Sequence, residues 1–411
     1  MFKDIVLFKD LGIKLTKRHK NILRLVLATT ICYMLAPYSA YYISNIEVYM
    51  MVVTAIIMAT WGRNMMDTKE IRKTRALFIA SFFIYFAITL VIHNEKPSIG
   101  VLCAIILGYY LLSLKYKYKV WVFDRFVSVV ALLFGLSALE YILASFFGIS
   151  HIDPTPLYRT VYSENYFFQG IITIFPAYYQ SGFARFQAFT EEPGLVGTLC
   201  AFMLACIDIK QKKWQAAVLI ICGILSMSLA FYLMFVLWII YNTQNLKNTK
   251  INLLLLLFIS IVCYFAQDAI TELIANRISE KGSISALDNR ASLAFKKAFD
   301  EFLVSADVVF GRGLRTFHSS FNYTSGSGAN AGAKPFIYSY GVFSMILLFI
   351  TYTKGFLKAN GKNAKALFIL IVFWLSFYQR EYWYAPYNMI PLFMYGAYDL
   401  YTQHTNKSNL Q

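Results

Sequence analysis

Long apolar runs separated by short polar stretches dominate the hydrophobic pattern of this chain. A membrane-spanning helix needs about 20 mainly apolar residues, because each residue adds about 1.5 Å toward a hydrocarbon core about 30 Å thick. Runs that read as spans recur along the whole sequence, so the pattern predicts an all-α polytopic membrane protein. The predicted spans are residues 22–43, 46–61, 76–92, 97–113, 126–149, 195–209, 251–266, 335–353, 365–379 and 385–402.

The apolar run from residue 214 to residue 243 is too long for one upright span. As a single helix it would measure roughly 43–45 Å, against a core about 30 Å thick. A hairpin of two short helices turning near Ser226 and Ser228 keeps the basic cluster of residues 354–365 on the side of the basic N-terminus, as the positive-inside rule requires. We therefore predict about twelve transmembrane helices with both termini cytoplasmic.

Composition and charge support this class. Hydrophobic residues make up 58% of the chain, charged residues 15%, and the mean hydropathy is +0.53, which excludes a soluble globular domain. Most of the 38 lysines and arginines fall in loops on the predicted cytoplasmic side, so the formal charge of +16 does not indicate a nucleic-acid partner. The six cysteines lie within apolar runs and predict neither a disulfide framework nor a metal site. We expect one integral membrane domain, residues 1–411.

Two segments are long enough to carry function in this topology. Residues 150–194 and 267–334 would lie outside the membrane, whereas the other external connections are only a few residues long. Loops of this length exceed what joining helices requires, and we expect short helices within them.

The first external segment ends in RFQAFTEEPG, residues 185–194. Pro193 suits the first turn of the following helix, and Glu191 and Glu192 favour a helix N-terminus through its dipole. Capping alone does not explain why Arg185 accompanies two acids. The cluster is therefore either a capped helix start with a paired arginine or part of a substrate site.

The second external segment contains a predicted amphipathic helix from Ser285 to Val304. Its apolar positions recur at helical intervals, namely Phe295, Phe299, Phe302 and Leu303. Arg290 lies in its first turn, where the helix dipole disfavours a cation. Either Asp288 or Glu280 compensates this charge, or an anionic ligand does.

Three further features carry candidate chemistry. In GRGLRTFH, Gly311 and Gly313 permit a tight turn around Arg312, with Arg315 and His318 close behind. The stretch 325–333 is either a linker or a lid that orders over substrate. Glu140 falls within a predicted span and needs a partner there, as a structural pair or as part of the site.

The order of these motifs resembles that of bacterial O-antigen polymerases and O-antigen ligases. The resemblance covers roughly residues 185–350 and runs from RFQAFTEEPG through ILSMSLAFYLMF and DNRASLAFKKAFDEFLVSADVVFGRG to IYSYGVFSMILL. It implies a GT-C-like membrane glycosyltransferase of lipopolysaccharide biosynthesis, in the bacterial inner membrane, that transfers glycans from undecaprenyl pyrophosphate or a similar carrier. Ligases typically have a His-Asn pair before the next span, whereas here Asn330 stands near that place and the nearby histidine is His318, which favours a polymerase.

The resemblance assigns roles to particular residues. It makes Arg185, Arg290 and Glu192 catalytic, the arginines holding the departing diphosphate and Glu192 acting as general base. The expected substrate-binding residues are Arg312, Arg315, His318, Glu191 and Glu140. We expect no metal and no cofactor. The expected partners are polyprenyl-pyrophosphate-linked glycans and membrane lipid, with a chain-length regulator as a further possible partner.

Two alternatives remain open from the sequence. One is an O-antigen ligase that transfers the glycan to lipid A-core. The other is a lipid-linked oligosaccharide flippase, which should bury charges along a central path and have short external loops.

Overall fold

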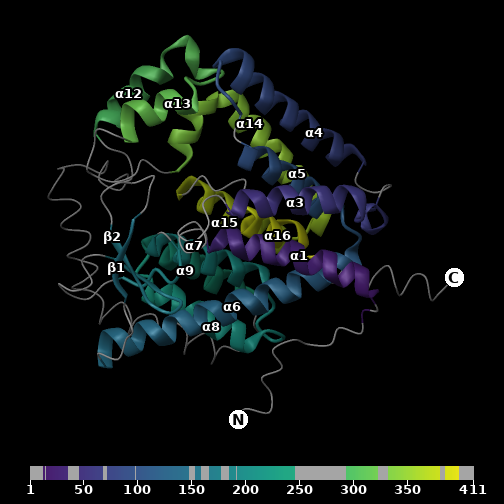
Figure 1. Ribbon diagram of the computed structural model, residues 1–411, viewed down its shortest axis with the longest axis vertical. Coiled ribbons are helices and arrows are strands. Elements are labelled where there is room, and N and C mark those ends of the chain that lie inside the picture. Colours follow the sequence, from purple (N-terminus) through teal and green to yellow (C-terminus); the bar gives the residue numbers. More distant parts are fainter. Residues whose placement is uncertain are drawn as a thin grey trace.

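The computed structural model describes residues 13, 15–35, 46–67, 72–97, 99–147, 153–158, 166–176, 185–190, 192–245, 293–322, 332–379 and 385–397. Most of these residues are helical, and the apolar helices follow the runs expected from the sequence (Figure 1). They are α1 (Lys17–Met34), α3 (Ile46–Thr60), α4 (Arg72–Ala87), α5 (Ile99–Ser113), α6 (Tyr116–Phe147), α7 (Pro193–Cys206), α8 (Lys213–Leu225), α9 (Leu229–Asn245), α14 (Ala333–Asn360), α15 (Ala364–Gln379) and α16 (Pro386–Met394). The span expected at 251–266 lies outside the described residues.

Among the described helices, α6 and α14 are long and apolar enough to cross a membrane. The remaining apolar helices are shorter, because several end at a break or a turn. The helix α4, for example, continues into a π-helix, η2 (Ile88–Ile92).

The helix α7 lies at the centre of the bundle. Its residues from Gly194 to Cys206 are all buried, and it packs against α8, α9 and α15. An all-round apolar helix is what a core position in a bundle requires. The predicted hairpin is confirmed, since α8 and α9 are two short helices joined by residues 226–228.

Residues 153–158 and 166–176 of the first external segment form strands, where short helices were expected. The strands β1 (Asp153–Tyr158), β2 (Tyr166–Gln169) and β3 (Ile174–Pro176) form an antiparallel sheet in the order β1-β2-β3. Tyr158 pairs with Tyr166, and Phe167 pairs with Pro176. Pro154 and Pro156 disfavour a helix interior, and β1 lies at the sheet edge, where proline is tolerated.

The second external segment forms a helical unit, residues 293–322, which we call the cap. It comprises α12 (Leu293–Leu303), η5 (Ala306–Val308), α13 (Leu314–Phe317) and η6 (His318–Asn322). The expected apolar face of α12 is confirmed at its phenylalanines, which are buried with two aromatic residues from elsewhere; these five are Phe295, Phe299, Phe302, Phe317 and Tyr338. Leu303 departs from the expectation, being 46% exposed.

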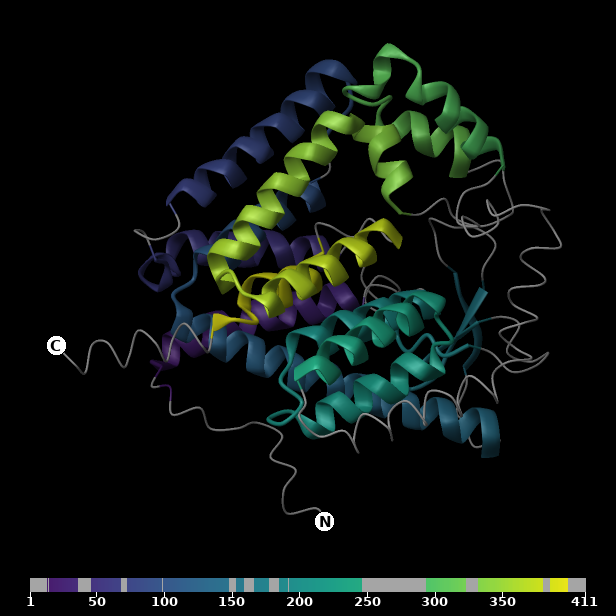
Figure 2. The same ribbon diagram turned by 180° about the vertical axis from the view of Figure 1, so that it is seen from behind.

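The cap and the sheet lie on the same side of the helix bundle (Figures 1 and 2). The helices α4 and α14 pack together and extend from the cap along one edge of the molecule. This arrangement brings the two external segments to one end of the bundle, where the candidate site was expected.

Candidate active site between the sheet and the cap

Residues 185–190 are held on the turn of the α8–α9 hairpin. The Phe186 amide donates to the Leu225 carbonyl at 3.1 Å, and Arg185 Nε donates to the Ser226 carbonyl at 3.1 Å. Met227 has a φ of +47°, a left-handed conformation that is uncommon for a side chain with a Cβ. The hairpin turn thus holds the guanidinium of Arg185 through its Nε.

A close approach between α7 and the hairpin turn fixes this geometry further. A Cβ on Gly197 would lie 2.4 Å from Ser228 Cβ and 2.9 Å from Ser226 Oγ. Only glycine allows the helix and the turn to come this close. The spacing between Arg185 and the start of α7 is therefore set by backbone packing.

Aromatic contacts attach the same segment to α6. Phe189 stacks on Phe134 with ring centroids 5.1 Å apart, and Phe186 meets Tyr141 edge-on at 5.3 Å. Both phenylalanines of the segment are fully buried. Burying a phenylalanine contributes about 1.5–3 kcal/mol, so the segment is anchored well beyond its hydrogen bonds.

Glu192 is the N-cap residue of α7, and Pro193 occupies the first turn as expected. The Glu192 side chain makes no capping hydrogen bond, and its backbone carbonyl accepts from Thr190 Oγ1 at 3.0 Å. The same carbonyl accepts from the Leu195 amide at 3.0 Å, and the Glu192 charge is favourable at the positive end of the helix dipole. Glu191 lies outside the described residues.

Glu140 binds the turn between β2 and β3. Its carboxylate oxygens accept hydrogen bonds from the backbone amides of Ile171, Ile172 and Thr173, the last two at 2.8 Å each. Thr173 Oγ1 also lies 2.7 Å from Ser137 Oγ. Glu140 thus acts as the anchor of the sheet on α6, which favours the structural interpretation of this residue; its predicted part in substrate binding stays a prediction.

The Gly311–Arg312–Gly313 turn packs on a break in α14. Gly341 has a φ of +80° within that helix, and a Cβ there would lie 2.2 Å from the Val309 carbonyl oxygen. The break leaves carbonyls of α14 without helical partners, and the turn supplies them: the Arg312 amide donates to Tyr338 at 2.8 Å and the Gly313 amide to Ser339 at 3.0 Å. Gly311 and Gly313 have φ of +84° and +90°, which confirms the predicted tight turn.

The guanidinium of Arg312 is engaged within the cap. Its Nε donates to Asp307 Oδ2 at 2.8 Å, and it lies over the rings of Phe302 and Tyr338 at 5.7 and 5.6 Å. Hydrogen bonding to the Tyr338 hydroxyl and to Asp307 raises the pKa of Arg312. These contacts give Arg312 a structural use, while its predicted substrate contact stays a prediction.

Residues of the short loop after α4 hold the other face of the turn. His93 Nε2 lies 3.0 Å from the Phe310 carbonyl oxygen, and Glu95 Oε1 accepts from the Arg315 amide at 3.0 Å. The Arg315 side chain is exposed. Burial lowers the pKa of His318 below its usual value, and the negative charge of Glu95 opposes this shift.

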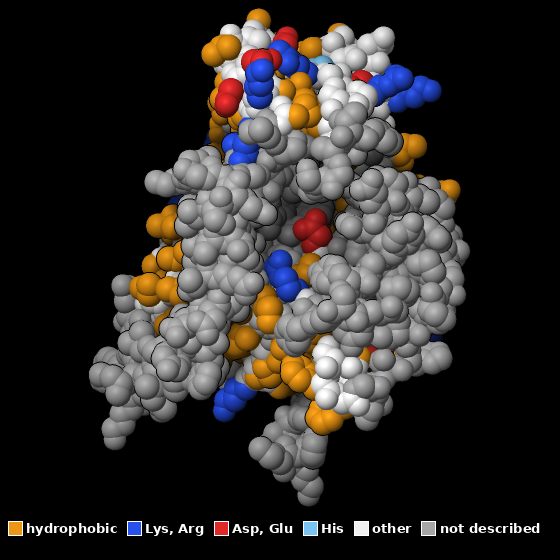
Figure 3. Space-filling view, turned by 90° about the vertical axis from the view of Figure 1, so that its left-hand side faces the viewer, with side chains coloured by type: hydrophobic (Ala, Val, Ile, Leu, Met, Phe, Trp, Pro, Cys, Tyr) orange, Lys and Arg blue, Asp and Glu red, His pale blue; other side chains and the backbone are white. Residues whose placement is uncertain are grey.

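His93 and Glu95 were not predicted from the sequence. The available signal was HNEK, a polar stretch between two apolar runs, but a stretch of this kind is also what any short external connection contains. On the side of the molecule that carries the sheet and the cap, an acidic and a basic side chain are exposed close to each other (Figure 3).

Arg185 lies on the turn of the α8–α9 hairpin and Glu192 at the start of α7, and the cap contains Arg312, Arg315 and His318. The predicted convergence of Arg185 with Arg290 involves a residue outside the described ranges.

Comparison with protein-family models and with curated proteins gave no match for this chain.

Proposed function

We propose that this protein is an O-antigen polymerase, a membrane glycosyltransferase that joins polyprenyl-pyrophosphate-linked repeat units on the outer face of the bacterial plasma membrane. The observation that carries the proposal is the fixed placement of Arg185, whose Nε is held at 3.1 Å from the Ser226 carbonyl beside the Glu192 start of α7. The sheet and the cap lie on one side of this apolar helix bundle (Figures 1 and 2).

In this mechanism Arg185 and Arg290 bind the pyrophosphate that leaves as the new glycosidic bond forms. A guanidinium remains charged and offers paired donors to phosphate oxygens, so it stabilises the charge that develops on the leaving group. Glu192 accepts the proton of the attacking sugar hydroxyl as general base. The anomeric carbon exchanges its bond to the phosphate oxygen for one to this hydroxyl oxygen in a single displacement, with inversion.

The proposed membrane arrangement has twelve spans with the termini in the cytoplasm. The lengths of α6 and α14 support crossing, and the hairpin of α8 and α9 supports the number of spans assigned to residues 214–243. Among the described residues, Lys119 and Asp124 are the buried charged side chains, and both lie near the start of α6. A flippase needs charges along a central path, so this distribution favours a transferase.

The decisive experiment replaces Arg185 by alanine in a bacterium that lacks its own copy of this gene. Loss of a guanidinium from a leaving-group site should reduce polymer formation by about a hundredfold or more. Arg24→Ala is the matched control, because Arg24 is an exposed arginine on α1. Polysaccharide length and amount are measured on gels, with membrane levels of each variant determined in parallel.

Normal polymer from the Arg185→Ala variant would contradict the assignment of this residue. The same strain separates polymerase from ligase. Without a polymerase a single repeat unit is still attached to lipid A-core, whereas without a ligase none is attached.

A further inference from the structure

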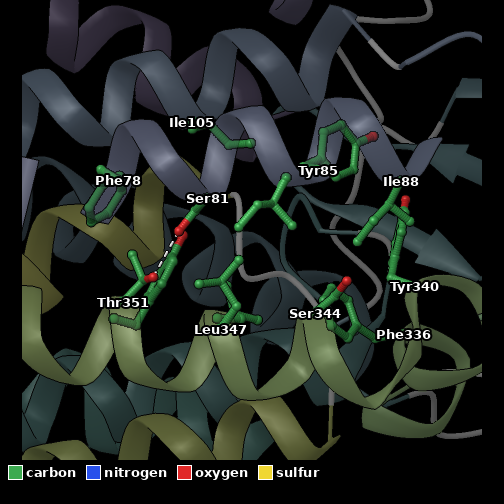
Figure 4. A pocket seen from close by; sticks show the side chains of 13 residues that line it. Phe78, Ser81, Tyr85, Ile88, Ile105, Phe336, Tyr340, Ser344, Leu347 and Thr351 are labelled. Carbon is green, nitrogen blue, oxygen red and sulfur yellow. Dashed lines mark hydrogen bonds between the residues drawn. The ribbon is translucent and has the colours of Figure 1, made fainter. Parts of the chain in front are cut away.

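A groove runs between α4 and α14 on the edge of the bundle that leads away from the cap (Figure 4). Its cavity measures about 50 Å³ and is open on one side, with Ile105 of α5 at its back. Its lining on α14 extends from Phe336 to Tyr352, across the break at Gly341.

The groove is lined almost entirely by hydrocarbon, including Phe78, Ile88 and Leu347. Ser81 and Thr351 are polar, but their hydroxyls bond each other at 2.8 Å and Ser81 also donates to the Leu77 carbonyl. A polar ligand therefore gains little from this end. The hydroxyl-bearing rings of Tyr85 and Tyr340 stand at the opposite end (Figure 4).

The faces of α4 and α14 that point away from the groove carry exposed apolar side chains. Phe83 of α4 is 63% exposed and Ile346 of α14 is 53% exposed. Exposed apolar faces on two neighbouring apolar helices are typical of contact with lipid tails. We therefore expect the two helices that form the groove to lie next to lipid.

The end of the groove near Tyr340 adjoins a basic turn. The Gly313 amide is bonded to Ser339, next to Tyr340 in α14, and the Arg315 amide is bonded to Glu95, three residues after η2. The backbone of Arg315 thus lies next to the two helices that form the groove, and its side chain is exposed. An apolar channel with a cation at its mouth suits an amphiphile with an anionic head.

We propose that this groove binds the isoprenoid chain of the polyprenyl pyrophosphate carrier, with Arg315 contacting its pyrophosphate. A carrier of this kind has one chain, which a single groove accommodates, whereas a phospholipid has two. The inference rests on the proposed function, because that function supplies the carrier as substrate.

Binding is tested with the purified full chain in nanodiscs by native mass spectrometry, with polyprenyl pyrophosphate as the probe. Leu347→Trp fills the groove, and Ile346→Trp places the same side chain on the adjacent exposed position as control. Leu347→Trp should weaken binding by about tenfold or more, because a filled groove excludes the chain, and Ile346→Trp should change it less than about twofold. Ser344→Phe, a second lining position, guards against a folding defect at Leu347.

The head-group contact is tested with Arg315→Ala. This variant should bind polyprenyl pyrophosphate more weakly, and its binding of polyprenol, which has no phosphate, should be unchanged.

Equal binding of polyprenyl pyrophosphate by the Leu347→Trp and Ile346→Trp variants would overturn the proposal that the groove is the binding site. Equally strong competition by phosphatidylglycerol would also overturn it. Loss of polymer in Arg185→Ala together with unaltered lipid binding in Leu347→Trp would reject the groove and keep the polymerase. Groove binding without polymer formation by the unaltered protein would reject the polymerase.

Discussion

Arg312 and Arg315 are close in sequence and differ in what surrounds them. Arg312 is bonded to Asp307 and lies over two aromatic rings, whereas the Arg315 side chain is exposed. From the sequence motif alone, both arginines are expected to bind phosphate. The partners of the two arginines distinguish them. Asp307 could be recognised as the partner of Arg312 only once the turn of the cap was known.

His318 gives the cap a pH-dependent stability. Burial lowers its pKa in the folded state, so the unfolded chain takes up the proton first as the pH falls through the usual histidine value of about 6.5. The stability contributed by neutral His318 is fully present above that value and decreases below it. Glu95 reduces the size of the effect.

We therefore expect the unaltered protein to lose more thermal stability than His318→Gln when the pH is lowered from about 7.5 to about 5.5. The measurement is thermal unfolding of purified protein in detergent at both pH values. Identical losses for the two proteins would show that His318 does not carry this pH dependence.

At the scale of elements, the helices were largely predictable and the contacts between segments were not. The lengths of apolar runs and the distribution of lysine placed α3, α5 and the α8–α9 hairpin correctly. The strands of residues 153–176 were missed because their alternation is short and interrupted by prolines. Residues 311–313 contact the break in α14 through backbone hydrogen bonds. Such bonds do not depend on side chains, so the glycines with positive φ are the signal of this contact in the sequence.

The break in α14 should tolerate no side chain at Gly341. Alanine there combines an unfavourable positive φ, costing about 1–2 kcal/mol, with a collision against the Val309 carbonyl oxygen. Gly361 has a similar φ of +85° but no atom within 4 Å of an added Cβ, so Gly361→Ala isolates the cost of the backbone conformation. Gly341→Ala should therefore lower the thermal unfolding temperature more than Gly361→Ala, and equal decreases would contradict the packing described for the turn.

For the whole molecule, the proposed orientation places the cap outside the cell and the α7–α8 connection in the cytoplasm. Thr316 in the cap and Lys210 in that connection are both exposed. Each is replaced by cysteine in a variant whose native cysteines are changed to alanine. An impermeant thiol reagent should label position 316 in intact cells and position 210 only after the membrane is opened.

Labelling of position 210 in intact cells would reverse the proposed orientation. The candidate site would then face the cytoplasm, where the polymer is not assembled in the proposed function. Active protein levels in the cysteine-replaced background serve as the control for correct insertion.

The short helices α7 and α8, of 14 and 13 residues, have a consequence for the surrounding bilayer. Each measures about 20 Å, well below the thickness of a hydrocarbon core of about 30 Å. In the proposed orientation, α7 is covered by its neighbouring helices, and lipids next to α8 must thin or be replaced by water. A dimple in the outer leaflet would then let a sugar hydroxyl descend to Arg185 while the carrier's tail stays immersed.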